Sequence, residues 1–217
     1  MSDTHIYNYP GKDIDVTWDQ RLCIHIGECG RAKGELFVGG RNPWCQPNLV
    51  SSEEVVDVVG RCPTGALTYQ HKVGGSPETS ANTNTVVVSY NGPLFVRGDL
   101  DIDGATEDMT GVKFRTALCR CGQSEHKPFC DNSHEKVEFQ DYGAVGETGQ
   151  ELNQTGGKLT IKRVKDGPLL LSGNVTMIAS SGREAWHGTH TALCRCGASK
   201  NKPFCDGSHQ AAGFVAD

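Results

Sequence analysis

The chain has 217 residues, a hydrophobic fraction of 36% and 27 glycines, which favours two or three small domains over one large core. A formal net charge of -5 argues against nucleic acid as the main partner, and no apolar run approaches membrane-spanning length. The opening residues, MSDTH, lack the basic and apolar segments of a secretory signal. We therefore expect a reducing, cytoplasmic location, in which the 10 cysteines bind metal and do not form disulfides.

Residues 1–73 are expected to form the first domain, which contains four of the cysteines. They are Cys23, Cys29, Cys45 and Cys62. Ser51 and Glu54 have the spacing of a capping box, which predicts a helix that runs through the valines at 55–59. This helix leads directly into Cys62 and Pro63.

The segments CIHIGEC, which begins at Cys23, and CPTGAL, which begins at Cys62, resemble a single-cluster bacterial ferredoxin. Ferredoxins of this type place three cysteines at successive steps of three, but the middle position here is Ile26, so one corner of the cluster lacks its thiolate. The resemblance implies a 3Fe-4S cluster on Cys23, Cys29 and Cys62. The alternative is a 4Fe-4S cluster with Cys45 as fourth ligand; otherwise Cys45 is a small buried hydrophobe. Structural zinc or free thiols are the alternative for the whole domain.

Residues 74–84, GGSPETSANTN, have almost nothing to bury and are expected to be a linker. Beyond them, TALCRCG at 116–122 returns at 191–197, an offset of 75 residues. KPFCD and SH return in the same register, as does the upstream GPL. The repeat is therefore a whole structural unit and not a short motif copied twice.

The first unit is expected at residues 85–142 and the second at 158–217, with a polar connecting segment at 143–157. Each unit opens with two β-rich stretches separated by an Asn-Gly-Pro or Asp-Gly-Pro turn. Such a pattern predicts a β-hairpin at the start of each unit.

Each unit carries three cysteines and one histidine at the same spacing. They are Cys119, Cys121, Cys130 and His134 in the first unit, and Cys194, Cys196, Cys205 and His209 in the second. Two cysteines one residue apart on an extended segment point to the same side, so they can bind one iron. The third cysteine and the histidine four residues later share a face if their segment opens a helix, and they can bind a second iron.

The segment CDGSH at 205–209, preceded by Cys194 and Cys196, resembles the CDGSH iron-sulfur domain of the NEET proteins. Residues 1–73 resemble the divergent ferredoxin-like domain that is often found beside such domains. The first unit departs from the signature at Asn132, where the family has Gly, but Asn tolerates left-handed backbone conformations better than most residues. The resemblance implies one 2Fe-2S cluster per unit, held by three Cys and one His, in a strand-rich pseudo-dimer formed within one chain.

The expected fold class is therefore α+β, with a ferredoxin-like domain followed by two β-rich CDGSH units. A zinc site uses the same donor atoms and is the alternative to each 2Fe-2S cluster. A histidine ligand raises the reduction potential relative to an all-cysteine cluster and can be protonated, so we expect acid-labile clusters. Cysteine in place of His134 or His209 is expected to slow their loss.

No Gly-rich nucleotide fingerprint or phosphate-binding loop is visible, so we expect a protein that is not an enzyme. It would pass electrons, or donate clusters, to redox or cluster-acceptor proteins, with neither nucleic acid nor membrane as a partner. One alternative is a redox or iron sensor that regulates a partner through cluster occupancy. Another is an electron-input subunit of an oxidoreductase. The resemblance implies that the CDGSH units pair within the chain, in which case a monomer suffices.

Overall fold

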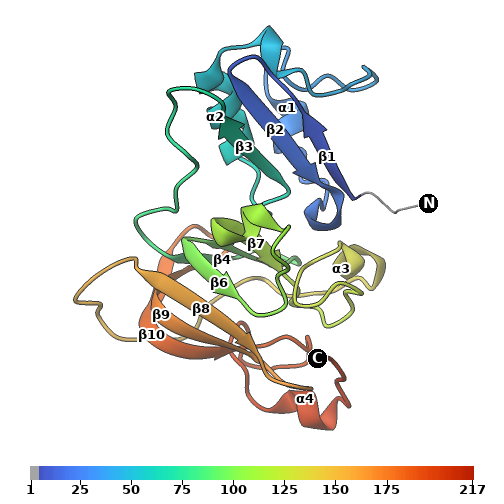
Figure 1. Ribbon diagram of the computed structural model, residues 1–217. Coiled ribbons are helices and arrows are strands. Elements are labelled where there is room, and N and C mark those ends of the chain that lie inside the picture. The colour runs from blue at the N-terminus through green and yellow to red at the C-terminus, as the bar shows by residue number, and fades with distance from the viewer. Residues whose placement is uncertain (1–4) are drawn as a thin grey trace.

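The computed structural model describes residues 5–217, so the first four residues, which include most of the segment considered for a secretory signal, lie outside the described part. The elements in chain order are β1 Ile6–Tyr9, β2 Ile14–Asp19, α1 Glu28–Arg31, α2 Ser52–Gly60, β3 Leu67–His71, β4 Thr85–Val88, β5 Leu94–Arg97, β6 Asp99–Ile102, β7 Arg115–Leu118, α3 Ser133–Lys136, β8 Lys158–Arg163, β9 Leu169–Ile178, β10 Glu184–Leu193 and α4 Ser208–Ala211, with 3-10 turns at Gln20–Leu22, Pro47–Leu49 and Thr110–Lys113. The protein is a mixed helix and strand chain built mainly from sheet (Figure 1). Among residues 5–217, no helix combines the length and the apolar character needed to cross a membrane.

The N-terminal domain is a three-stranded antiparallel sheet, in the order β1-β2-β3, packed against α2. The predicted helix start is confirmed, because the Ser51 hydroxyl accepts a hydrogen bond from the Glu54 backbone N–H at 3.2 Å. The side chains that bury the apolar face of α2 are Val55, Val58 and Val59. The helix therefore ends two residues before Cys62, and the sheet holds that end in place.

The two repeated units share one seven-stranded sheet, in the order β6-β8-β9-β4-β5-β7, with β10 paired to β9. Both predicted hairpins are present, since β4 pairs antiparallel with β5 and β8 pairs antiparallel with β9. In Figure 1 this sheet lies below the N-terminal domain, and the C-terminus ends beside it.

The units exchange strands in matching registers. β4 of the first unit runs parallel to β9 of the second, with Thr85 opposite Thr176. β6 of the first unit runs parallel to β8 of the second, with Asp101 opposite Thr160. Shifting one pair by the 75-residue repeat gives the other pair, so the two contacts are equivalent. Each unit thus completes the sheet of the other, and both contribute to one hydrophobic core.

Arg115, the first residue of β7, ties the N-terminal domain to the first unit. Its side chain is buried, and its Nε donates a hydrogen bond to the Cys62 carbonyl at 2.6 Å. A terminal nitrogen donates to the Leu67 carbonyl at 2.8 Å, and the guanidinium also pairs with Glu78. Because Glu78 belongs to the interval expected to be a linker, this ion pair holds that interval against the protein body.

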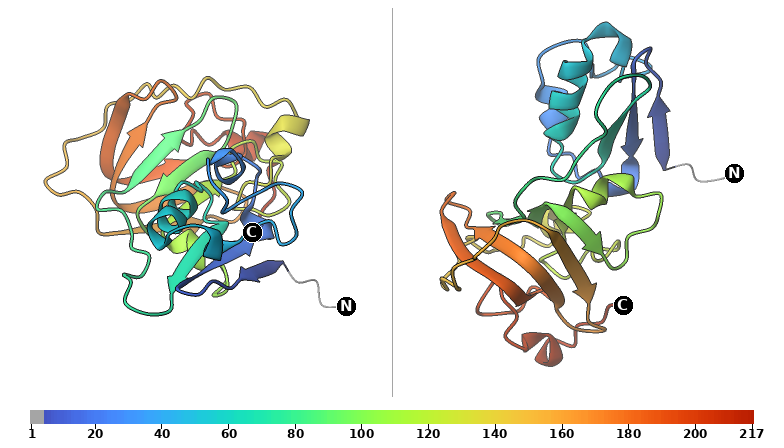
Figure 2. Two further views of the ribbon diagram at one scale, coloured as in Figure 1. Left: turned by 90° about the horizontal axis from the view of Figure 1, so that it is seen from above. Right: turned by 60° about the vertical axis from the view of Figure 1, so that its left-hand side comes forward.

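Backbone contact reinforces the same junction, which the right-hand view of Figure 2 shows from the side. Gly65 of the N-terminal domain and Gly111 of the first unit lie so close that a Cβ on either would overlap the backbone of the other. Gly65 also has a φ of +75, which glycine adopts readily. At the edge of the junction, Arg21 forms a 3.0 Å ion pair with Asp108. The two parts therefore meet through tight, specific packing.

Candidate cluster sites

The first two cysteines of each unit follow directly after a strand, Cys119 after β7 and Cys194 after β10. The sulfurs of Cys119 and Cys121 lie 3.7 Å apart, and those of Cys194 and Cys196 also lie 3.7 Å apart. The structure therefore brings these cysteines together as the spacing predicts.

The third cysteine of each unit lies beside the histidine. The Cys130 sulfur is 3.4 Å from His134 Nδ1, and the Cys205 sulfur is 3.5 Å from His209 Nδ1. Burial lowers the pKa of His134, which favours the neutral imidazole that binds metals. Each unit thus presents one Cys–Cys pair and one Cys–His pair.

The predicted reason for the second pairing is wrong. The short helix α3 begins at Ser133, so Cys130 lies on the turn before the helix and not on a shared helical face. Asn132 makes this turn with a φ of +69, and Gly207 makes the equivalent turn with a φ of +85. The expectation that Asn can replace Gly here is confirmed, because both residues adopt the left-handed conformation.

An aspartate next to each third cysteine fixes the turn. The Asp131 carboxylate accepts hydrogen bonds from the backbone N–H groups of Ser133, at 3.0 Å, and Glu125, at 2.8 Å. Asp206 accepts the corresponding bonds in the second unit. The turns are therefore built identically, and the two sites have the same local scaffold.

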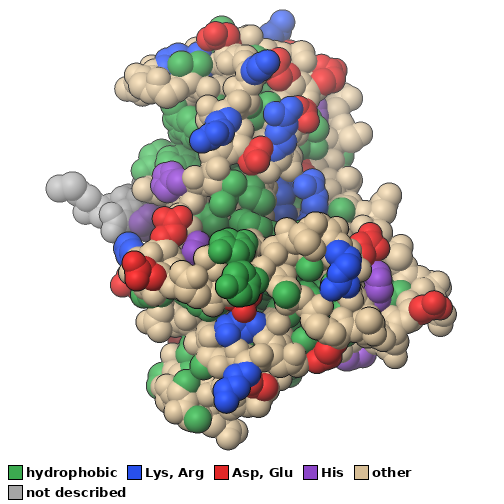
Figure 3. Space-filling view, turned by 180° about the vertical axis from the view of Figure 1, so that it is seen from behind, with side chains coloured by type: hydrophobic (Ala, Val, Ile, Leu, Met, Phe, Trp, Pro, Cys, Tyr) green, Lys and Arg blue, Asp and Glu red, His purple; other side chains and the backbone are tan. Residues whose placement is uncertain are grey.

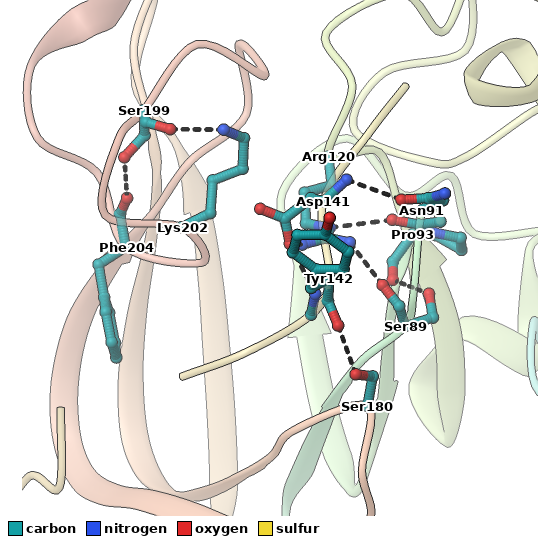
Figure 4. Close-up of polar contacts among 12 residues, drawn as sticks. Ser89, Asn91, Pro93, Arg120, Asp141, Tyr142, Ser180, Ser199, Lys202 and Phe204 are labelled. Atoms are coloured by element: carbon teal, nitrogen blue, oxygen red, sulfur yellow. Dashed lines mark hydrogen bonds and ion pairs between the residues drawn. The ribbon is translucent and has the colours of Figure 1, made fainter. Parts of the chain in front are cut away.

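A serine also supports each turn. Ser199 donates its hydroxyl hydrogen to the Phe204 carbonyl at 2.7 Å, as Figure 4 shows, and Ser124 makes the same bond to Phe129 at 2.6 Å. The backbone of the cysteine that follows the phenylalanine is also held, because the Cys130 N–H donates to the Ala117 carbonyl at 2.9 Å.

Burial and hydrogen bonding act in opposite directions on the thiols. The hydrogen bond between Cys119 and Cys121 lowers the pKa of Cys119 and raises that of Cys121. Burial raises the pKa of Cys130 to about 12 and also raises that of Cys194. Buried thiols of this kind lose their protons readily only beside a positive charge such as a metal ion, so the sites suit a metal-containing group better than free thiolates.

The sequence reasoning missed Arg120 and Arg195, which stand between the paired cysteines and are each 1% exposed. Because side chains alternate along an extended segment, they point away from the sulfurs. Arg120 pairs with Asp141 (Figure 4), and its Nε donates to the Gly92 carbonyl at 2.9 Å. Arg195 Nε donates to the Gly167 carbonyl at 3.0 Å. The sequence feature that could have identified these two arginines is the Cys-Arg-Cys segment, which occurs in both units.

The two repeated sites lie back to back. A Cβ on Gly122 would meet the Cys196 carbonyl at 2.5 Å, and one on Gly197 would meet the Cys121 carbonyl at 2.6 Å. Both glycines also have a φ of +81, so a side chain is disfavoured there both by the overlap with the other unit's backbone and by the left-handed conformation. The backbone after each cysteine pair therefore packs against the other pair.

Three cysteines of the N-terminal domain surround one cavity of about 430 Å³, namely Cys23, Cys29 and Cys62. Burial raises the pKa of Cys29, and the nearby Cys62 and Cys23 raise it further. Cys45 is not among the residues that line this cavity, and it is 1% exposed in the hydrophobic core of the domain. The structure thus brings three of the four predicted residues together and leaves the fourth in the core.

Ile26, which stands where ferredoxins place their middle cysteine, lines the same cavity and is 46% exposed. Figure 3 shows hydrophobic side chains gathered at the height where the N-terminal domain meets the repeated units. The corner of the site without a thiolate therefore faces an apolar, partly open surface.

Across residues 5–217, no three His, Cys, Asp or Glu side chains lie close enough together to hold a single metal ion. The close contacts among the repeated donors are pairwise, at 3.4 to 3.7 Å. Any group bound at a repeated site would therefore have to accept one Cys–Cys pair and one Cys–His pair as ligands.

Comparison with known proteins covers both halves of the chain. A family model described as a divergent 4Fe-4S mono-cluster matches residues 9–72, and one described as an iron-binding zinc finger of CDGSH type matches residues 91–135 and 166–210. The uncharacterized protein YjdI of Escherichia coli strain K12 is 45% identical over 64 residues, which span 30% of this chain and 84% of that protein. YjdI of Escherichia coli O157:H7 matches equally well. No solved structure matches the chain.

Proposed function

Because the chain belongs to the CDGSH-type iron-binding family, with a divergent 4Fe-4S mono-cluster domain ahead of its two repeats, we propose that it is a carrier of electrons or clusters that holds three iron-sulfur clusters. In this proposal each repeated unit binds one 2Fe-2S cluster and the N-terminal domain binds one ferredoxin-type cluster. The protein is not itself an enzyme, acts in the cytoplasm, and delivers electrons or clusters to redox or cluster-acceptor proteins.

The pairing of the donors is the observation that carries this proposal. A mononuclear zinc site needs four donors around one ion, whereas a two-iron cluster takes one pair of donors at each iron. In the first unit the Cys119–Cys121 pair would hold one iron and the Cys130–His134 pair the other. A 2Fe-2S cluster supplies one-electron chemistry when bound, and the protein holds and shields it.

The strand exchange supports an intrachain pseudo-dimer. The equivalent pairings of β4 with β9 and β6 with β8 relate the units to each other as two subunits of a symmetric dimer would be related. Because both units lie in one chain, no second copy is needed to complete either site.

For the N-terminal domain we favour a 3Fe-4S cluster on Cys23, Cys29 and Cys62, since these three residues line one cavity and Cys45 lies outside its lining. The description of the matching family names a 4Fe-4S cluster, which is the alternative. Anaerobic purification followed by iron and sulfide counts, with electron paramagnetic resonance before and after dithionite, tests the whole proposal. A colourless protein that contains zinc and no acid-labile sulfide would contradict it.

Replacing Ile26 with Cys is expected to convert the N-terminal cluster to 4Fe-4S, because the new thiolate supplies the missing corner. The oxidised resonance of a three-iron cluster should disappear, and a reduced cubane resonance should replace it. Iron content should rise by about one atom per chain. Ile26→Ser is the matched control, since it makes the position equally small without adding a thiolate, and it should leave the three-iron resonance in place.

Replacing His134 or His209 with Cys is expected to slow cluster loss in acid. Imidazole is a neutral donor that protons can displace from iron, whereas thiolate binds iron as an anion. The measurement is the decay of cluster absorbance at pH about 5, below the ordinary pKa of histidine. Each single variant should stabilise one of the two repeated clusters and leave the other at the wild-type rate. Equal decay in wild type and variants would exclude the histidines as the acid-sensitive ligands.

A further inference from the structure

Among residues 5–217, the hydrogen bonds of the N-terminal domain reach the first repeated site and not its equivalent. Asn132, on the turn between Cys130 and His134, donates its side-chain N–H to the Ile24 carbonyl at 2.8 Å. Gly207 occupies the same position in the second unit and has no side chain that could make such a bond. The departure of the first unit from the CDGSH signature therefore creates a contact between domains.

Ile24 lies between two candidate ligands, Cys23 of the N-terminal domain and Cys130 of the first unit. It follows Cys23 directly in the chain, and its side chain is 3% exposed and packs against Cys130 and Ala117. Asn132 lies two residues after Cys130 in the chain. A continuous path thus leads from Cys23 through one peptide bond to the Ile24 carbonyl, across one hydrogen bond to Asn132, and on to Cys130.

Arg115 provides a second link between the same two sites. Its Nε donates to the carbonyl of Cys62, and β7 then runs from Arg115 to the residue before Cys119. His190 takes the place of Arg115 in the second unit, and its ring bonds to Ser172 and Thr189 on its own sheet. Both links therefore belong to the first unit.

Burial follows the same asymmetry. Cys121 and Cys130 are buried in the first unit, whereas their equivalents Cys196 and Cys205 are only half-buried. Phe95, which packs against Ile24 and Cys130 in the first unit, is partly buried, whereas Leu170 at the equivalent position of the second unit is 44% exposed. The second site is thus the more accessible of two sites that share one local scaffold.

We propose that the three clusters form an ordered relay, in which the N-terminal cluster exchanges electrons with the first unit's cluster through Ile24 and Asn132, and the second unit's cluster meets the external partner. This inference rests on the proposed function. In each step one cluster loses one electron and the next gains one, without bond breakage. The initial electron comes from an external one-electron reductant, and the back-to-back contact of the repeated sites carries it onward.

The test is flash photoreduction of the full, cluster-loaded chain, with transient absorption to follow redistribution of the electron and electron paramagnetic resonance to identify the reduced clusters. The background carries Cys196→Ser, so that only the N-terminal and first-unit clusters remain. Asn132→Gly is expected to slow exchange between them severalfold, because it removes the hydrogen bond that joins Asn132 to the Ile24 carbonyl. It should fold normally, because Gly207 adopts the same turn in the second unit.

Gly207→Asn is the matched control, since it adds the same side chain at a position where the described residues leave open space around the new Cβ, and it should leave the exchange rate unchanged. In a second background, Cys121→Ser removes the first unit's cluster and should abolish fast transfer from the N-terminal cluster to the second unit. An unchanged rate in Asn132→Gly, an equal change in Gly207→Asn, or fast transfer without the first cluster would overturn the relay. Failure of the wild-type chain to bind iron and sulfide would instead overturn the proposed function.

Discussion

Replacing Cys196 with Ser should remove the two-iron cluster of the second unit and leave the rest of the iron bound. A serine hydroxyl is a far weaker ligand for iron than a thiolate, and the Cys194–Cys196 pair would lose one of its two soft donors. We expect the variant to lose about two irons and two sulfides per chain. Cys121→Ser should produce the same loss from the first unit, and Mössbauer spectra would show that the remaining clusters are unaltered.

Cys45→Ala is the control for this experiment. Cys45 is as buried as several of the predicted ligands but lies outside the lining of the N-terminal cavity, so its loss should leave the iron content unchanged. A drop in iron in this variant would make Cys45 the fourth ligand of a 4Fe-4S cluster. If Cys196→Ser retained full iron and sulfide, the second repeated site would not hold a cluster through that cysteine.

Replacing Arg115 with Met should lower the free energy of unfolding by about 3–5 kcal/mol, the typical result of removing one partner of a buried ion pair. The variant leaves the Glu78 carboxylate without its buried partner and removes the donors to the carbonyls of Cys62 and Leu67. Met matches the length of the arginine stem, so little packing volume is lost. Urea unfolding followed by circular dichroism measures the change.

His190→Met tests the equivalent position of the second unit. His190 is largely exposed and bonds only within its own sheet in the part of the chain described, so its replacement should change stability by less than about 0.5 kcal/mol. Similar losses in the two variants would show that Arg115 acts through its strand and not through the N-terminal domain.

Features specified by nearby residues were predictable from the sequence. The capping box at Ser51, the two hairpins and the sulfur contact between Cys119 and Cys121 all depend on residues within a few positions of one another, and all are present. The pairing of Cys130 with His134 was also predicted, but for the wrong reason. A left-handed residue at Asn132 places the cysteine before the helix, and spacing alone does not distinguish a turn from a helical face.

Features that join distant parts of the chain were not predictable. The parallel pairing of β4 with β9, the contact between Gly65 and Gly111, and the hydrogen bond from Asn132 to Ile24 each join segments more than 40 residues apart. The role of Arg115 was not predictable for the same reason. From the sequence alone, an arginine at the start of a strand is expected to lie in solvent, and its buried partners are far away in the chain. The position of Cys45, outside the lining of the cavity that the other three cysteines share, likewise depends on how the core of that domain packs.

The exchange of strands between the units has a consequence for biosynthesis. While the ribosome is still translating the connecting segment, β6 has emerged but β8, the strand it pairs with in the sheet, has not yet been made. The nascent chain therefore exposes an unpaired sheet edge until residue 163 is available, and such edges favour aggregation. A gene truncated after its first repeat would encode all four donors of one site and their local turns but not β8 and β9, so we expect its product to leave the pairing edges of β6 and β4 exposed.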